Sequence, residues 1–457
     1  MKRLSFISIL TAVLILSSVT SCKKYIDINI SPNSPLNVSP DVVLTAAEVN
    51  LGYAVGGADV ALITGIFDKE VVGSDRQFFA YQSYIFVADN FSNIWGTMYE
   101  SVMNNLYQLI QLSQANNNKY YDGIAKVLMA YSIGTTTDLW GDVPYSQAFQ
   151  GDANLKPAYD KQQDIYTAIF KLLDDAITDF NTPAAQAGAK PGKDDVIYQG
   201  NISKWIKFAN SLRLRYLIHT VKVDNTAVQK VLNALNPAGG LFSSNADDAK
   251  VPFLNDESRA NPLYQFEEQR SGYTNYHSYF SDQLISLQDP RVRAYLDTTN
   301  YSSGVAHLGP LLGSISSPVT LMSYAELQFI IAEAYTRAGD YVNGATYFQN
   351  GVSASIMNAG GSSTDVNNYF LNNVGDDRVN YTTSSNKLMT VMMQKYFALY
   401  LQYEAFSDWR RTGYPNLTPN TGTQIPRRYL YPQTELSYNQ QNVPTGTTLF
   451  TKVWWDQ

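Results

Sequence analysis

Residues 331–352 read IAEAYTRAGDYVNGATYFQNGV and carry the clearest fold signal in the chain. They predict two antiparallel helices joined by a tight turn at Ala338-Gly339-Asp340. Ala332 and Ala334 on the first helix are small enough to let the second helix approach closely. Phe348 on the second helix is large enough to fill the gap between neighbouring helices. The sequence therefore predicts a closely packed helical hairpin here.

This hairpin resembles a tetratricopeptide unit, a pair of helices that stacks against similar pairs. Only one such unit is clear in the sequence, so a plain helical hairpin is the alternative interpretation. Stacked units of this kind usually serve as binding scaffolds. The resemblance therefore favours a binding function over catalysis.

Helical periodicity also occurs outside the hairpin. Shorter apolar series begin at Leu106, Ile124 and Trp205. The longest apolar face consists of Ile165, Ile169, Leu172, Leu173, Ala176, Ile177 and Phe180. No comparable series of alternating strands appears, although short hairpins fit the Gly- and Asn-rich stretches 237–262 and 359–383. We expect an all-α fold, a tetratricopeptide-like scaffold with long irregular loops and minor β-hairpins.

The composition is that of a folded protein with a large core. Of 457 residues, 45% are hydrophobic and only 16% are charged, which excludes a disordered chain. The 33 tyrosines suggest many half-buried rings with polar tips. A net charge of −7 argues against nucleic acid as a partner.

The N-terminus predicts a lipoprotein signal. The basic start Met1-Lys2-Arg3 precedes the mostly apolar segment 4–19, which is typical of a secretory signal peptide. Val19-Thr20-Ser21-Cys22 fits a bacterial lipobox, and Cys22 is the only cysteine of the chain. An ordinary signal peptide followed by an accidental cysteine is the alternative. We expect cleavage before Cys22 and acylation of its sulfur, which would hold the mature protein on a membrane.

The domain organisation follows from this start. Residues 1–21 are the expected signal peptide, and residues 22–44, with three prolines among Asn and Ser, are the expected lipidated tether. Residues 45–457 are expected to form a single helical domain. No later run of 18 apolar residues predicts a transmembrane helix.

The sequence contains no convincing catalytic or metal-binding motif. His219, His277 and His307 are too widely spaced for a zinc motif, and no nucleophile elbow, dinucleotide fingerprint or P-loop occurs. Adjacent acidic pairs such as Asp174-Asp175 are more typical of a solvated helix face than of a glycosidase. We predict no catalytic residues, no metal and no cofactor.

Two arginine pairs, Arg410-Arg411 and Arg427-Arg428, allow two interpretations. They could clamp an anion, because guanidinium groups bind carboxylates and phosphates in a bidentate manner. Alternatively, they pair with nearby acids to hold a loop. The acids considered are Glu404, Asp408 and Glu435.

A series of short motifs resembles the SusD/RagB family of nutrient-binding outer-membrane lipoproteins. The most specific block is TDLWGDVPYSQA, residues 137–148, in which Asp138, Trp140, Gly141 and Pro144 are expected to serve as scaffold. The other blocks, which follow in family order over nearly the whole chain, are residues 22–33, 157–166, 205–215, 289–291, 324–334, 394–396, 410–415 and 427–432.

The resemblance implies a cell-surface protein that captures an oligosaccharide, or in some relatives a peptide, without chemistry. It also implies a partner, a SusC-like TonB-dependent β-barrel that the lipoprotein covers as a lid. The implied location is the outer membrane, through the lipid on Cys22 and facing the outside. Lys23 and Lys24 directly after Cys22 depart from the acidic residues common in surface-exported relatives, and this puts the leaflet in doubt. A surface-anchored glycosidase or peptidase is the alternative, and a purely structural lid is a second one.

Ligand residues do not transfer from the family, so we chose them from physical chemistry. Sugars present flat C–H faces that stack on aromatic rings and hydroxyls that bond amides and carboxylates. Two aromatic-rich stretches without helical periodicity, 75–95 and 264–280, are therefore expected to form one shallow ligand face. The best candidates in them are Trp95, Tyr81, Tyr273 and Tyr276.

Overall fold

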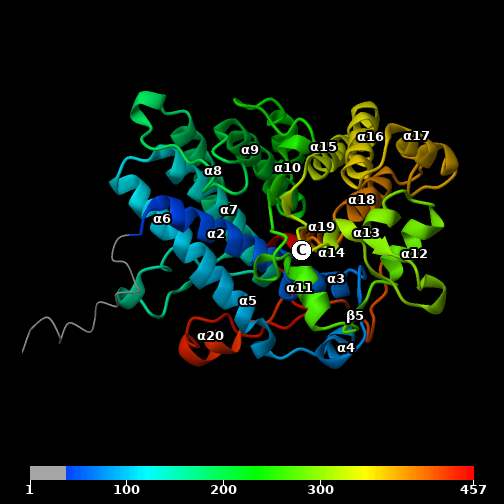
Figure 1. Ribbon diagram of the computed structural model, residues 1–457, viewed down its shortest axis with the longest axis horizontal. Helices are drawn as coiled ribbons and strands as arrows, with labels where there is room; N and C mark the ends of the chain where they lie inside the picture. The colour runs from blue at the N-terminus through cyan, green and yellow to red at the C-terminus, as the bar shows by residue number, and fades with distance from the viewer. Residues whose placement is uncertain (1–37) are drawn as a thin grey trace, which may run out of the picture. The chain divides into compact units, whose positions relative to one another are not determined.

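The computed structural model describes residues 38–457, of which Pro40–Gln457 form one compact unit (Figure 1). The predicted signal peptide, Cys22 and the tether up to residue 37 lie outside the described residues. The α-helices are α2 (Pro40–Gly56), α3 (Ile63–Phe67), α4 (Arg76–Gln82), α5 (Ser92–Gly96), α6 (Asn104–Ala115), α7 (Lys119–Trp140), α8 (Gln162–Phe180), α9 (Ile202–His219), α10 (Ala227–Asn233), α11 (Pro262–Gln269), α12 (Tyr279–Ser286), α13 (Val292–Tyr295), α14 (Pro310–Gly313), α15 (Tyr324–Ala338), α16 (Tyr341–Asn358), α17 (Ser363–Asn372), α18 (Lys387–Ala398), α19 (Tyr403–Thr412) and α20 (Gln433–Tyr438).

The described β-structure consists of short antiparallel pairs. The pairs are β1 (Val72–Gly73) with β5 (Thr274–Asn275), β2 (Val143–Pro144) with β3 (Tyr159–Asp160), β4 (Ala249–Val251) with β8 (Val319–Met322), and β6 (Leu296–Asp297) with β7 (His307–Leu308). The prediction of an all-α fold with minor β-structure is confirmed. The two stretches expected to hold hairpins do not form them. In 237–262, strand β4 pairs with a strand far along the chain, and 359–383 contains helix α17.

The helical hairpin of the opening prediction is confirmed. Helix α15 and helix α16 are joined at Gly339, whose φ of 80° lies in the left-handed region that favours glycine. A Cβ on Gly351 of α16 would lie 2.9 Å from the Phe329 ring on α15. The Phe329 ring of α15 therefore packs directly on the backbone of α16 at this point. In Figure 1, α6 and α8 lie toward the left of the unit, and α16 and α17 lie toward the right.

The predicted face of residues 165–180 is also confirmed in helix α8. Ile165, Ile169 and Leu173 on this face are buried, whereas Leu172 and Ile177 at its edge are half-buried. Burying such a face stabilises a helix because each fully buried aliphatic side chain contributes about 1.5–3 kcal/mol.

The predicted tether ends earlier than expected. Helix α2 begins at Pro40, and Val43 and Leu44 are already buried. Proline often breaks a helix, but it is favourable at the first position because its missing N–H would be unpaired there anyway. The continuous stretch Pro40–Phe67 has the length and hydropathy of a membrane span, with 67% of its most apolar window buried inside the protein. A buried core helix satisfies the same criterion.

The segment Asp138–Pro144 acts as scaffold, as predicted, although not by capping. Helix α7 ends at Trp140, and Gly141 takes a φ of 82° that releases the chain from the helix. Asp138 is fully buried and accepts hydrogen bonds from Tyr166 Oη at 2.7 Å and from Trp455 Nε1 at 2.8 Å. The segment therefore ties α7 to α8 and to the C-terminus.

A buried network of charges joins the central helices. Arg215 of α9 makes a bidentate pair with Glu326 of α15, with both N–O distances 2.6 Å. One turn later on α9, His219 Nε2 lies 2.7 Å from Glu404 Oε1 of α19. Because an unpaired buried charge is strongly destabilising, these contacts fix how α9, α15 and α19 meet.

The arginine pairs belong to the same buried framework and do not form an anion clamp. Arg411 of α19 binds Glu333 Oε2 of α15 at 2.7 Å and Asp408 Oδ1 at 2.5 Å. Arg410 donates to the backbone carbonyl oxygen of Asp138 at 2.6 Å, and Arg427 donates to Asp456 Oδ2 at 2.7 Å. Of the acids considered, Asp408 pairs with Arg411, whereas Glu404 lies against His219 and Glu435 bonds Tyr159. Arg428 is buried and donates its Nε to the carbonyl oxygen of Tyr429 at 3.2 Å.

The network shifts the pKa values of its members. Burial alone would lower the pKa of His219, but the carboxylates of Glu404 and Asp138 outweigh it and raise the pKa to about 9. Burial would raise the pKa of Glu404, but His219 and Arg215 outweigh it and lower the pKa to about 2. Both groups are therefore charged near neutral pH.

We predict that the protein loses stability between pH 6.5 and 9 through His219. A raised native pKa stabilises the fold fully below the ordinary value of 6.5, and this contribution disappears as the pH rises through about 9. The free energy of unfolding should fall by on the order of 3 kcal/mol over this range. Denaturant unfolding at several pH values, compared between wild type and His219→Gln, measures the effect.

The matched control is His307→Gln, because His307 is exposed. This variant should retain the decline of the wild type, whereas His219→Gln should be less stable and nearly flat from pH 6.5 to 9. An equal decline of stability in His219→Gln would show that His219 does not cause the loss of stability between pH 6.5 and 9.

Candidate functional site

The two aromatic-rich stretches lie side by side in the fold. Strand β1 pairs with strand β5 in the register Val72 to Asn275 and Gly73 to Thr274. The backbone N–H of Ser74 donates to the carbonyl oxygen of Tyr273 at 2.8 Å and continues the pairing. Residues 75–95 and 264–280 are thus brought together although about 200 positions separate them.

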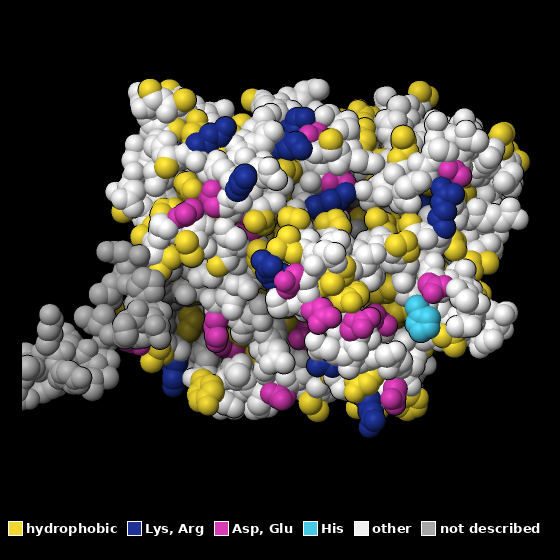
Figure 2. Space-filling model, in the orientation of Figure 1, with side chains coloured by type: hydrophobic (Ala, Val, Ile, Leu, Met, Phe, Trp, Pro, Cys, Tyr) yellow, Lys and Arg dark blue, Asp and Glu magenta, His cyan; other side chains and the backbone are white. Residues whose placement is uncertain are grey.

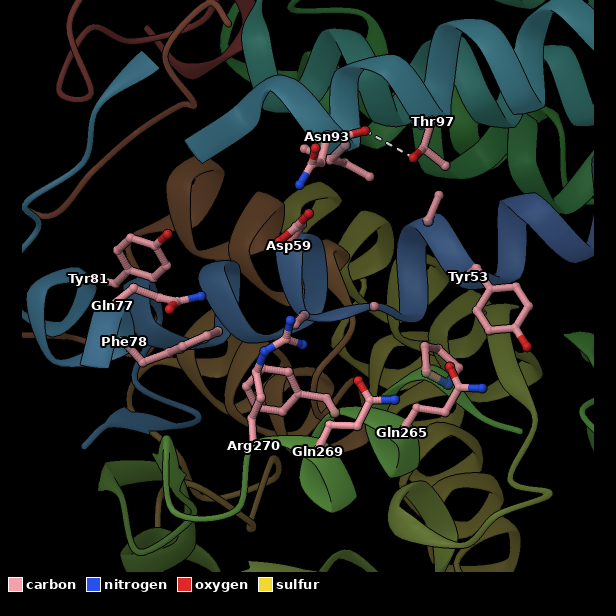
Figure 3. A pocket seen from close by; sticks show the side chains of 16 residues that line it. Tyr53, Asp59, Gln77, Phe78, Tyr81, Asn93, Thr97, Gln265, Gln269 and Arg270 are labelled. Atoms are coloured by element: carbon pink, nitrogen blue, oxygen red, sulfur yellow. Dashed lines mark hydrogen bonds between the residues drawn. The ribbon is translucent and has the colours of Figure 1, made fainter. Parts of the chain in front are cut away.

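Next to this junction lies a cavity of about 360 Å³, which we call the central cavity (Figure 3). Its walls come from the end of α2, from α4, from the segment 93–97 and from α11. The volume is within the range of ligand pockets, about 300–1,000 Å³. Side chains from both predicted stretches, including Gln77, Tyr81, Gln265 and Arg270, face into it.

A break in the first long helix forms one wall. Helix α2 ends at Gly56, and after Gly57 a short π-helical segment, η2 (Ala58–Leu62), leads into α3. Such π-segments frequently occur at functional sites. The break points the side chain of Asp59 into the cavity, opposite Arg270 of the α11 end (Figure 3).

Asp59 and Arg270 give the cavity one charge of each sign. Burial raises the pKa of Asp59, and the positive charge of Arg270 opposes this rise. The Arg270 guanidinium lies 5.6 Å from the centre of the Phe266 ring, a cation–π distance. Asp59 is the sole carboxylate among the lining residues.

Side-chain amides provide most of the remaining polar surface. Gln77, Asn93 and Gln269 line the cavity, and within residues 38–457 their side chains make no hydrogen bond. Gln265 uses its Nε2 to donate to the backbone carbonyl oxygen of Glu257 at 2.9 Å, and its side chain also interacts with the Tyr53 hydroxyl. An amide both donates and accepts, so this set can bond sugar hydroxyls and acetamido groups alike.

Most aromatic rings of the cavity are buried in its walls and do not present an open face to a ligand. Phe78, Tyr81 and Phe266 line it with only 3%, 8% and 4% of their surface exposed. Tyr53, on the last turn of α2, is half-buried and offers the most accessible ring. Tyr81 stacks on Phe86 with a centroid distance of 4.4 Å, which fixes its ring in place.

The four predicted ligand residues do not share one face. Tyr81 lines the central cavity, but Trp95 points to the other side of the segment 92–99 and lines a separate hollow. Trp95 is 5% exposed and packs edge-on against Trp140 at 5.2 Å. The expectation of a single shallow face is therefore wrong for Trp95.

Neither of the two candidates from the second stretch lines the central cavity. Tyr273 is half-buried behind it, with its ring edge-on to Phe266 at 6.4 Å. Tyr276 is fully buried, and its hydroxyl donates to Glu267 Oε1 at 2.8 Å. An enclosed ring cannot stack on a ligand, so Tyr276 is corrected from ligand residue to core residue.

Sequence reasoning missed Tyr53, Asp59 and Thr97, which all line the cavity. Tyr53 and Thr97 lie in helical segments that carry no local sign of exposure. Asp59 did have a signal, since it follows two glycines as the only charged residue between Leu51 and Phe67. A single acid in an apolar run indicates a special environment.

The described residues contain no group of three or more His, Cys, Asp or Glu side chains that could hold a metal ion. The face shown in Figure 2 carries acidic and basic side chains interspersed, without a continuous basic area. Nothing in this arrangement resembles an electrostatic surface for nucleic acid. The site is suited to reversible binding of a polar, uncharged ligand.

The fold and the cavity together define a helical-repeat binding scaffold. A protein family described as "Starch-binding associating with outer membrane", SusD-like, matches residues 32–432. The chain therefore belongs to the SusD-like family. A comparison with curated proteins gave no match.

Solved structures support the same assignment. A chitin-binding protein is 27% identical, with a TM-score of 0.79 over 92% of this chain and all of its own. A SusD/RagB family protein from Bacteroides thetaiotaomicron is 25% identical, with a TM-score of 0.73 over 92% of this chain and 99% of its own. A chitin-binding SusD homologue from Flavobacterium johnsoniae, 22% identical, has a TM-score of 0.72 over 92% and 97% and shows the shared fold.

We predict that Tyr276→Ala destabilises the protein by about 3–5 kcal/mol, because a buried ring leaves a cavity when it is removed. Denaturant unfolding measures the change. The control is Phe79→Ala, which removes a ring that is 66% exposed. This substitution should change the free energy of unfolding by less than about 0.5 kcal/mol. Equal stability of the two variants would return Tyr276 to the list of accessible rings.

Proposed function

We propose that this protein captures a glycan in the central cavity, outside the cell, and passes it to a SusC-like TonB-dependent β-barrel transporter. The observation that supports this most directly is a cavity of about 360 Å³ lined by unpaired amides, in a chain of the SusD-like family. The family description names starch binding and association with the outer membrane. The cavity supplies a plausible place for such binding on this chain.

The lining favours an uncharged glycan. Gln77, Asn93 and Gln269 can each bond hydroxyl or acetamido groups. The negative charge of Asp59 and the positive charge of Arg270 balance each other, so the lining favours neither sign of ligand charge. Chitin oligosaccharides are the first ligands to test, because a 27% identical protein of the same fold is chitin-binding. Malto-oligosaccharides are the second, from the family description. A peptide ligand is the outcome to consider if both fail.

The central cavity does not favour the alternative of a glycosidase. Glycoside hydrolysis needs two carboxyl groups about 5–9.5 Å apart at the scissile bond. The cavity offers Asp59 alone, which is compatible with holding a sugar. We therefore propose a protein that binds its ligand and leaves it intact.

The proposed anchor is the lipid on Cys22, which lies outside the described residues. It is supported by the basic and apolar start of the chain and by the lipobox Val19-Thr20-Ser21-Cys22. Acyl chains on one sulfur and the new N-terminus would keep the domain at the membrane, where a barrel partner resides. This arrangement places capture and transport side by side.

We predict that Asn93→Ala and Gln269→Ala each weaken binding of chitin or malto-oligosaccharides about 2- to 10-fold. Each substitution removes one neutral hydrogen-bonding group, which is worth about 0.5–1.5 kcal/mol. Isothermal titration of the mature domain measures the affinity, and chromatography of the sugar after incubation shows whether its length is unchanged.

Gln440→Ala is the matched control, because Gln440 is an exposed amide that does not line the cavity. Its affinity should equal that of the wild type. Unaltered binding by both cavity variants would place the glycan elsewhere, and shortened products would favour the enzyme.

We predict that Cys22→Ser releases the protein from the membrane and from its transporter. Wild type should partition into the detergent phase and, after gentle extraction, bring down a TonB-dependent β-barrel. A stable complex of this kind would bury more than about 2,000 Å². Membrane partitioning of Cys22→Ser equal to wild type would contradict the anchor, and recovery of anchored wild type without any barrel would contradict the partner.

A further inference from the structure

A second hollow, of about 530 Å³, lies on the other side of the segment Ser92–Tyr99. We call it the side hollow. Asn93, Ile94 and Thr97 of this segment face the central cavity, whereas Ser92, Trp95, Gly96 and Tyr99 face the side hollow. The spacing of three and four residues within each set is that of two opposite helix faces. One helical segment thus serves as the partition between two separate hollows.

The side hollow has a continuous aromatic wall. Trp95 lies 4.7 Å from Tyr99, and the Tyr99 ring is nearly parallel to that of Phe149, with centroids 6.0 Å apart. Tyr438 of α20 also lines it and is 75% exposed. Its ring makes no aromatic contact within the described residues. A tyrosine held at a hollow with a free face is a suitable platform for the C–H face of a sugar.

The backbone at Phe149 is strained. Its φ is 63°, in the left-handed region, where a bulky aromatic side chain is a genuine outlier. Such strain persists only where the surroundings enforce it, and it concentrates at ligand-binding positions. Here it places the ring between Tyr99 and Tyr107, in the wall of the side hollow.

The side hollow contains two carboxylates, Glu100 and Glu435, besides the hydroxyl and amide groups of Ser92, Asn104 and Thr434. Glu435 receives hydrogen bonds on Oε2 from Tyr159 Oη at 2.8 Å and from Asn439 Nδ2 at 3.1 Å, which leaves its other oxygen available. Glu100 is exposed and has no partner within residues 38–457. No lysine or arginine lines this hollow. Two carboxylates without a basic residue accept bonds from hydroxyl groups and repel acidic ligands.

We infer that the side hollow is a second binding site, for an uncharged oligosaccharide, separate from the central cavity. The free face of Tyr438 would hold a ring of the sugar against the aromatic wall, and Glu100 and Glu435 would accept bonds from its hydroxyls. Acidic glycans such as polygalacturonate are excluded by the two carboxylates. The inference does not depend on the central cavity, because none of its lining residues is shared.

The test uses the mature protein and four variants, titrated with chitotriose, maltotriose and trigalacturonate by calorimetry and by tryptophan fluorescence. Tyr438→Ala and Glu100→Gln should weaken binding of a neutral trisaccharide about 5-fold or more and melt within about 1 °C of wild type, because both side chains are exposed. Tyr341→Ala, which removes an exposed tyrosine elsewhere, should bind as wild type. Trigalacturonate should not compete.

The fourth variant, Asn93→Ala/Gln269→Ala, separates this inference from the function of the central cavity. This double variant should still bind the neutral sugar through the side hollow, and adding Tyr438→Ala to it should abolish that remaining binding. Loss of all binding in this variant, unchanged affinity in Tyr438→Ala, or no binding of either neutral sugar by wild type would each overturn the side hollow as a sugar site. Loss of a co-purifying protein by Tyr438→Ala, with sugar binding intact, would overturn it in favour of a protein interface.

Discussion

The structure depends on charged pairs that are enclosed between its central helices. Arg215 with Glu326, His219 with Glu404, and Arg411 with Glu333 are all inaccessible to water, and each pair joins two different helices. Removing one partner of a buried charge pair costs about 3–5 kcal/mol, because the other charge is left unpaired. Helices α9, α15 and α19 therefore have one permitted arrangement relative to each other. Apolar packing alone would tolerate slippage that these pairs do not.

This rigid framework explains how a cavity can be built from distant segments. The walls of the central cavity are the break after α2, the segment 93–97 and helix α11. These segments must hold their places although no common sheet joins them. Helix α11 packs against α2 and the break after it, and α2 packs against the π-helical segment Thr97–Met103. Tyr429 bonds the carbonyl oxygen of Asp59 at 2.8 Å, and the β1–β5 pairing fixes the entrance to α4. The walls are irregular because the regular elements behind them already provide the stability.

The sequence predicted the parts of the fold that have a local cause. The periodicity of Ile165–Phe180 and the small residues of the α15–α16 hairpin follow from near neighbours. The candidate site was less predictable. Whether Tyr276 or Trp95 is exposed depends on residues far away in the chain, such as Glu267 behind one and Trp140 behind the other. Aromatic composition indicated a region that lines the central cavity in part, but it contained no information on which ring faces remain open.

The partition between the two hollows has a consequence for how this protein can change over evolutionary time. Positions 93 and 97 belong to one hollow, and positions 92, 95, 96 and 99 to the other. A substitution on one helix face leaves the chemistry of the opposite face intact. Neither set includes a member of the buried charge pairs. Substitutions in this segment can therefore change the lining of one hollow at a time, on a scaffold that stays the same.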